Sequence, residues 1–129
     1  MIQTILQQSR KHDVVFSRRK GRIRICSRVS KDIGLKSGDV IDIAIKNGEY
    51  LLFVKYKSED ITGRYDGRVS PTNKGNCNNL IATSVKICNA MYKVVSNSEG
   101  LEALRLPAGN VVEVEGIGKA VPLITRTPL

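Results

Sequence analysis

A nine-residue block that occurs twice limits the possible folds of this chain more than any other sequence feature. Residues 35–43 (LKSGDVIDI) align without a gap with residues 106–114 (LPAGNVVEV). Upstream of these blocks, residues 23–27 align with residues 85–89. Chance similarity between two β-rich segments is the alternative explanation. Self-similarity of this kind indicates a duplicated supersecondary unit that buries its apolar face against a second copy.

The first copy has the residue pattern of a small β unit. Residues 22–26 (RIRIC) alternate polar and apolar, which predicts a half-buried strand with Arg22 and Arg24 on the solvent face. Ser27 is a candidate N-cap for a short helix that ends near residue 35. Asn47-Gly48 then predicts a tight hairpin turn between strands at 40–45 and 49–56, because both residues tolerate a positive φ.

The rest of the chain completes the predicted organisation. Residues 81–88 and 92–95 are strand-like or mixed, residues 96–105 favour a helical turn, and residues 111–114 and 120–125 are predicted strands. Pro122 lies in the last of these, which predicts an edge or bulged strand. We therefore expect an N-terminal arm and one domain at 14–129, which consists of repeat 1 (14–56), a polar linker (57–80) with a short strand near residue 69, and repeat 2 (81–126).

Length and composition agree with one mainly β domain. The chain has 129 residues, close to the size of a single domain. Aromatic residues make up only 5% of it and tryptophan is absent, so Val, Ile and Leu must build most of the core. Two of these are β-branched and favour sheets.

The positive charge is concentrated in one segment. The whole chain carries a net charge of +9, and residues 10–36 alone hold ten basic and two acidic residues, a net charge of +8. A field this concentrated attracts a polyanion, and nucleic acid is the commonest candidate. A solvated basic face that only maintains solubility is the alternative, and a membrane surface is a weaker third.

Residues 21–43 (GRIRICSRVSKDIGLKSGDVIDI) resemble the AbrB/MazE/SpoVT family of swapped-hairpin, or cradle-loop barrel, DNA-binding domains. The resemblance rests on Gly21-Arg22, the alternating strand, Gly34-Leu35-Lys36, Gly38-Asp39 and the acid at position 42. Cys26 and Ser27 depart from the family's usual Pro-Lys. The resemblance covers residues 14–56 well and residues 81–126 only through the repeat.

The resemblance implies a small closed β-barrel of the swapped-hairpin or double-psi type, built from two tandem repeats with short helices. Family members form this barrel from two interleaved chains, so a chain with two copies closes it alone. The resemblance also implies a DNA-binding protein, a transcriptional regulator, that presents a basic hairpin to duplex DNA. Arg22 and Arg24 are the candidates for the groove, and the other candidate contacts are Arg18, Arg19, Lys20, Arg28 and Lys31.

The sequence offers little for catalysis or metal binding. Cys26, Cys77 and Cys88 are an odd number without CxxC spacing, which favours reduced structural thiols. His12, the single histidine, lies in a polar stretch and is expected at the surface. No nucleotide-binding or metalloprotease motif occurs. We expect no enzyme, no cofactor and no metal.

The sequence is also consistent with other functions. A small enzyme on a double-psi barrel would need convergent acids, but the family pattern already explains Asp39 and Asp42 structurally. A non-catalytic interaction module is the main alternative to DNA binding, with the 57–80 loop as the surface for a protein partner, and a homodimer is also open. No apolar run approaches the ~20 residues that span a bilayer. The N-terminus lacks the pattern of a secretory signal, so we expect a cytoplasmic protein without a membrane partner.

Overall fold

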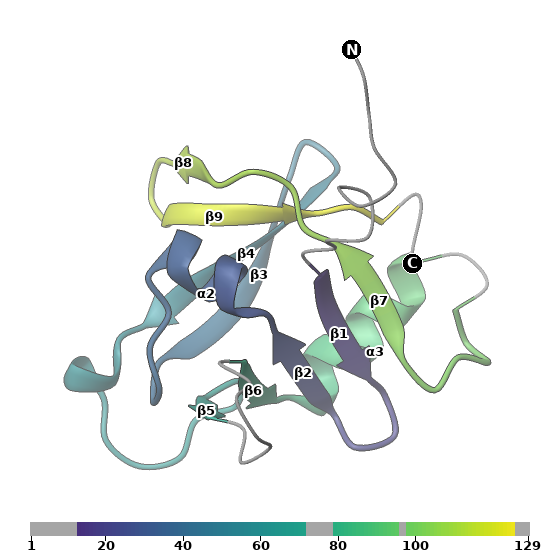
Figure 1. Cartoon of the computed structure of the whole chain (residues 1–129), viewed down its shortest axis with the longest axis horizontal. Coiled ribbons are helices and arrows are strands. Elements are labelled where there is room, and N and C mark those ends of the chain that lie inside the picture. The colour runs from purple at the N-terminus through teal and green to yellow at the C-terminus, as the bar shows by residue number, and fades with distance from the viewer. Residues whose placement is uncertain (1–12, 72–78, 96–97, 126–129) are drawn as a thin grey trace.

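The computed structural model describes residues 13–71, 79–95 and 98–125 of the chain, and these residues form a mainly β structure with two antiparallel sheets (Figure 1). The strands of the five-stranded sheet are, in spatial order, β5 (Val69–Pro71), β6 (Leu80–Thr83), β2 (Arg22–Ile25), β1 (Asp13–Ser17) and β7 (Leu104–Pro107). The strands of the four-stranded sheet are β3 (Val40–Lys46), β4 (Glu49–Tyr56), β9 (Gly118–Leu123) and β8 (Val112–Val114). The helices are α2 (Ser27–Ile33), α3 (Val85–Val94) and the 3₁₀ turn η1 (Ser58–Asp60).

The predicted alternation of residues 22–25 is confirmed. Ile23 and Ile25 are fully buried, whereas Arg22 and Arg24 are exposed on the other face of β2. The turn that precedes β2 packs against the start of α3, where the Ser84 N–H donates to the Gly21 carbonyl at 2.7 Å. Gly21 has a φ of +65°, and a Cβ atom there would lie 2.6 Å from a Val85 methyl group, so the turn requires glycine.

The predicted Asn47-Gly48 turn is also confirmed. The two residues have φ values of 52° and 78°, and they connect β3 to β4. Positive φ at both central positions gives a turn whose twist matches that of the flanking strands.

The order hairpin, helix, hairpin occurs twice along the chain. The first half runs β1, β2, α2, β3, β4, and the second runs β5, β6, α3, β8, β9 with β7 inserted after the helix. The second strand of each hairpin pairs with its counterpart from the other half, β2 with β6 and β4 with β9. The two halves therefore share both sheets.

Part of the predicted repeat alignment is wrong. Residues 85–89 do not form a strand equivalent to β2, because Val85–Val94 is the helix α3, capped by the Ser84 hydroxyl, which accepts from the Ile87 N–H. The strand that pairs with β2 is β6, immediately upstream. The core residues of α3 are Cys88, Met91 and Tyr92, a helical spacing that the short sequence window did not reveal.

Three local predictions also need correction. The N-cap of α2 is Cys26, not Ser27, and its side chain makes no capping bond. Strand β7 begins at Leu104, so the last two residues of the segment expected to be a helical turn (96–105) are extended; residues 96–97 of that segment lie outside the described structure. Pro122 lies in an inner strand, and β9 tolerates it because the pairing with β8 ends at Ala120.

The 57–80 segment is more structured than a linker. It contains η1 and the predicted short strand, β5, and Val69 exchanges backbone hydrogen bonds of 2.8 Å with Gly38 and Asp39. Residues 72–78 lie outside the described structure, as does His12 with most of the expected N-terminal arm.

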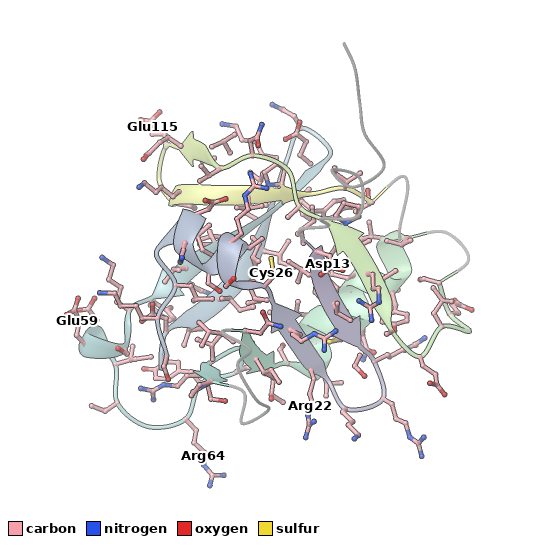
Figure 2. The ribbon with its side chains drawn as sticks, viewed as in Figure 1. Asp13, Arg22, Cys26, Glu59, Arg64 and Glu115 are labelled. Atoms are coloured by element: carbon pink, nitrogen blue, oxygen red, sulfur yellow. The ribbon has the colours of Figure 1, made fainter. Side chains whose placement is uncertain are left out.

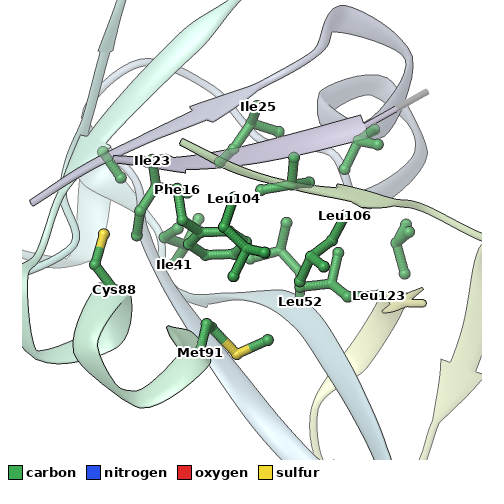
Figure 3. Packing of buried hydrophobic residues seen from close by; sticks show 14 of the residues in the cluster. Phe16, Ile23, Ile25, Ile41, Leu52, Cys88, Met91, Leu104, Leu106 and Leu123 are labelled. Carbon is green, nitrogen blue, oxygen red and sulfur yellow. The ribbon is translucent and has the colours of Figure 1, made fainter. Parts of the chain in front are cut away.

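The buried apolar residues form a core cluster that draws on both sheets and both α-helices (Figure 3). Phe16 of β1 and Tyr92 of α3 are its largest fully buried aromatic side chains. Most of the other members are Val, Ile and Leu, as the composition predicts. Among the residues that the structure describes, no helix has the length and apolar character needed to cross a membrane.

Candidate nucleic-acid interface

The outer face of the five-stranded sheet carries Arg22 and Arg24, the two arginines predicted to enter the DNA groove. Because β2 alternates, Arg22 and Arg24 point away from the core, and Figure 2 shows Arg22 extending from the ribbon near the turn. The register places Arg24 opposite Val15 of β1, and Val15 opposite Arg105 of β7. A row of Arg24, Val15 and Arg105 therefore crosses three adjacent strands, with an arginine on either side of the valine.

Val15 is the apolar element of this row. It belongs to the outer face rather than to the core cluster, yet only 7% of its surface is exposed. Its neighbours across both strands are arginines, whose aliphatic stems can lie along an apolar side chain while the charged groups stay in water. The outer face thus has an apolar side chain between two arginines.

The arginines of the outer face differ in their ionic partners. A guanidinium nitrogen of Arg105 lies 3.5 Å from a carboxylate oxygen of Asp13. Within the described part of the chain, no carboxylate oxygen lies within 4.0 Å of Arg22 or Arg24. Their positive charge is therefore not neutralised by a described neighbour.

The turn of the β1–β2 hairpin holds Arg18, Arg19 and Lys20, all exposed. Arg18 donates from Nε to the Asn89 side-chain oxygen at 3.3 Å, and its guanidinium carbon lies 5.6 Å from the centre of the Tyr92 ring. Both partners are on α3, which packs on the core side of the sheet (Figure 1). Arg18 is thus drawn away from the face that carries Arg22 and Arg24.

The remaining two predicted contacts, Arg28 and Lys31, lie on α2. This helix follows the end of β2 that is opposite to the basic turn. Arg28 lies 3.8 Å from Asp32 one helical turn later, and Lys31 is exposed. The structure therefore gathers five of the seven predicted residues on the hairpin and places two on the adjoining helix.

Sequence reasoning missed Arg105 as part of this face. Its signal is the segment Leu104-Arg105-Leu106, which alternates as β2 does, with both leucines fully buried. It also passed over Lys93, which is exposed on α3 together with Lys86. Helix α3 contains these two lysines and no acidic residue.

The acids considered for catalysis have structural partners. Asp39 is buried, and its carboxylate accepts the backbone N–H groups of Lys36 and Ser58 at 2.8 Å each. Asp42 accepts the N–H of Ile43 and lies 3.4 Å from the Lys55 ammonium group. Both carboxylates therefore organise the turn before β3 and the β3–β4 pair.

The two described cysteines differ in their surroundings. Cys88 is fully buried, and burial raises the pKa of its thiol to about 11. Cys26 is partly exposed. Among the described residues, no three His, Cys, Asp or Glu side chains cluster in a way that would hold a metal ion.

Comparisons with known proteins give no relative: no family model, curated protein or solved structure matches this chain.

Proposed function

We propose that this protein is a non-catalytic DNA-binding protein, a transcriptional regulator, that contacts duplex DNA through the outer face of the β1–β2 hairpin. The observation that carries the proposal is the pair Arg22 and Arg24, exposed side by side on one strand face without a described carboxylate partner. Both strands of this hairpin are inner strands of the five-stranded sheet, so the arginines approach DNA from the face of the sheet. Arginine in the major groove can bridge O6 and N7 of guanine.

The other basic side chains have a different role in this proposal. Lys20, Arg28 and Lys31 bind phosphates, which hold the protein on the duplex without reading its sequence. Each such contact releases counterions and steepens the salt dependence by about 0.9 units of log K against log salt.

For the architecture, we infer a duplicated swapped-hairpin unit that forms a double-psi type barrel within one chain. The twofold occurrence of hairpin, helix, hairpin and the pairing of β2 with β6 and β4 with β9 support this inference. A single unit would leave strand edges unpaired and bury too small a core, so the two copies stabilise each other.

The proposed barrel is basic on one side only. Strand β6, the partner of β2, has the sequence Leu-Ile-Ala-Thr and contributes no charge. One chain therefore presents one basic hairpin, β1–β2. Recognition of a palindromic DNA site with two half-sites requires two chains.

The experiment that tests the proposal is a fluorescence anisotropy titration of the full chain with duplex DNA. The R22A/R24A variant should lose at least about tenfold in affinity, because each good arginine contact with a base contributes about 1–3 kcal/mol. The matched control is K46A/K119A, which removes the same charge from exposed positions on the four-stranded sheet. Equal losses in the two variants would show a diffuse charge effect and refute the proposed interface.

A further inference from the structure

A second basic feature lies at the tip of the β1–β2 hairpin, away from the outer face. It is an open depression of about 610 Å³ between the turn and the segment that follows α3. Its lining residues are Ser17, Arg18, Arg19, Lys20, Gly100, Leu101 and Glu102. Depressions of this volume are in the range that accommodates small ligands or parts of larger ones.

Hydrogen bonds hold the two walls of the depression to the same helix. The Tyr92 hydroxyl of α3 lies 3.1 Å from the carbonyl oxygen of Phe16, next to one wall, and 3.1 Å from that of Leu101, in the other. The Ser98 hydroxyl lies 2.7 Å from the Tyr92 carbonyl oxygen and 2.9 Å from that of Val95. The Tyr92 hydroxyl therefore connects the backbone on the two sides of the depression.

The net positive charge of the side chains that line the depression favours the binding of an anion. One wall presents three consecutive cations, Arg18, Arg19 and Lys20, and the other contributes a single carboxylate, Glu102. Arg18 is oriented by its hydrogen bond to Asn89 and by the Tyr92 ring, so less side-chain entropy is lost when its other N–H groups bind a ligand. Arginine and lysine side chains donate charge-assisted hydrogen bonds to the oxygens of a phosphate group. Such contacts do not require an apolar pocket around the ligand.

We propose that this depression is a phosphate-binding site, separate from the outer face, with Arg19 and Lys20 as its main ligands and Arg18 as a pre-oriented third. The phosphate belongs either to the backbone of a bound nucleic acid or to a free phosphorylated molecule. Only the first of these sources depends on the proposed function. Because α3 holds Arg18 on the core side of the sheet, the site does not need Arg22 or Arg24.

The test is an NMR titration of the ¹⁵N-labelled full chain with sodium pyrophosphate at constant ionic strength. The wild type should show saturable shifts at residues 17–20 and 100–102. The R19A/K20A variant should bind pyrophosphate at least about tenfold more weakly, since it loses two charge-assisted contacts. The R22A/R24A and K46A/K119A variants should bind as the wild type does. Absence of saturable shifts, or equal weakening in K46A/K119A, would overturn the site.

A second arm identifies the source of the phosphate. With duplex DNA, R19A/K20A should reduce the slope of log K against log salt by about 1.8, two contacts at about 0.9 each, if the nucleic-acid backbone occupies the site. A reduction of about 0.9 would correspond to the Lys20 phosphate contact of the proposed DNA interface alone. If the wild type binds pyrophosphate but no duplex, the proposed DNA-binding function fails while the phosphate site stands with a free phosphorylated ligand. If the duplex binds and pyrophosphate does not, the site is refuted and the outer face is unaffected.

Discussion

The carboxylate of Asp39 accepts a 2.8 Å hydrogen bond from the backbone N–H of Ser58, nineteen residues further along the chain. Its second oxygen accepts the N–H of Lys36, also at 2.8 Å, and only 4% of the residue is exposed. One buried side chain thus connects the turn before β3 to the segment after β4. This explains the Gly38-Asp39 pair as a structural element of the hairpin unit.

The first prediction concerns this connection. Asp39→Ala should lower the free energy of unfolding by about 3 kcal/mol, because it removes two charge-assisted hydrogen bonds that connect separate segments of the chain. Urea denaturation measures the change. The control is Asp60→Ala at an exposed position in η1, which should stay within about 0.5 kcal/mol of the wild type. A similar loss in both variants would contradict the structural role of Asp39.

The second prediction concerns the hydroxyl of Tyr92. Tyr92→Phe should destabilise the protein by about 1–2 kcal/mol, since the carbonyl groups of Phe16 and Leu101 lose their shared donor. Thermal and urea unfolding measure the loss. Tyr65→Phe is the control, because Tyr65 is 42% exposed. If the two variants are equally stable, the hydroxyl does not fasten the walls of the depression.

The third prediction concerns the pH dependence that Cys88 contributes. Its folded-state pKa is raised to about 11, above the ordinary value of 9.0, mainly by burial and in smaller part by Asp66, while a backbone hydrogen bond from Ser17 lowers it. The folded state therefore favours the neutral thiol. This stabilisation is fully present below pH 9.0 and is lost as the pH rises towards about 11.

Urea denaturation of the wild type and Cys88→Ala between these pH values isolates the effect. The wild type should lose more stability than the variant over this range. The pKa of Tyr92 is also raised, mainly by burial, which is common to both proteins, and in smaller part by the Cys88 thiolate, which the variant lacks. Parallel stability curves would show that the Cys88 thiol does not titrate differently in the folded state.

The fourth prediction concerns the cysteines' reactivity. At pH 8 the raised pKa leaves Cys88 with about 100-fold less thiolate than an ordinary cysteine, and the thiolate is the reactive form. Iodoacetamide should therefore modify the partly exposed Cys26 well before Cys88, which mass spectrometry of the two peptides can follow. Equal rates in the folded protein would contradict the burial of Cys88.

Local sequence patterns predicted the strand and the turn whose conformations are set by neighbouring residues. The alternation of residues 22–25 and the Asn47-Gly48 turn need only the period of a strand and the φ preference of two residues. Helix α3 was missed because Val85, Ile87 and Cys88 are β-branched or apolar residues whose short run does not distinguish the two periods.

The arrangement of the candidate interface depends on long-range contacts that no local sequence pattern predicts. Arg105 joins the outer face only because β7 pairs with β1, about ninety residues away in sequence. Arg18 leaves that face only because α3 places Asn89 and Tyr92 beside it. The basic segment was recognised from its charge, whereas its division between two sides of the sheet required the tertiary structure.

Duplex binding by the wild type and R22A/R24A at a low and a higher salt concentration most directly tests the proposed DNA interface. We expect the wild type to bind at low salt and to weaken steeply at higher salt, while R22A/R24A binds at least about tenfold more weakly under both conditions. Negligible, salt-insensitive binding by both proteins would contradict a nucleic-acid interface on the β1–β2 hairpin.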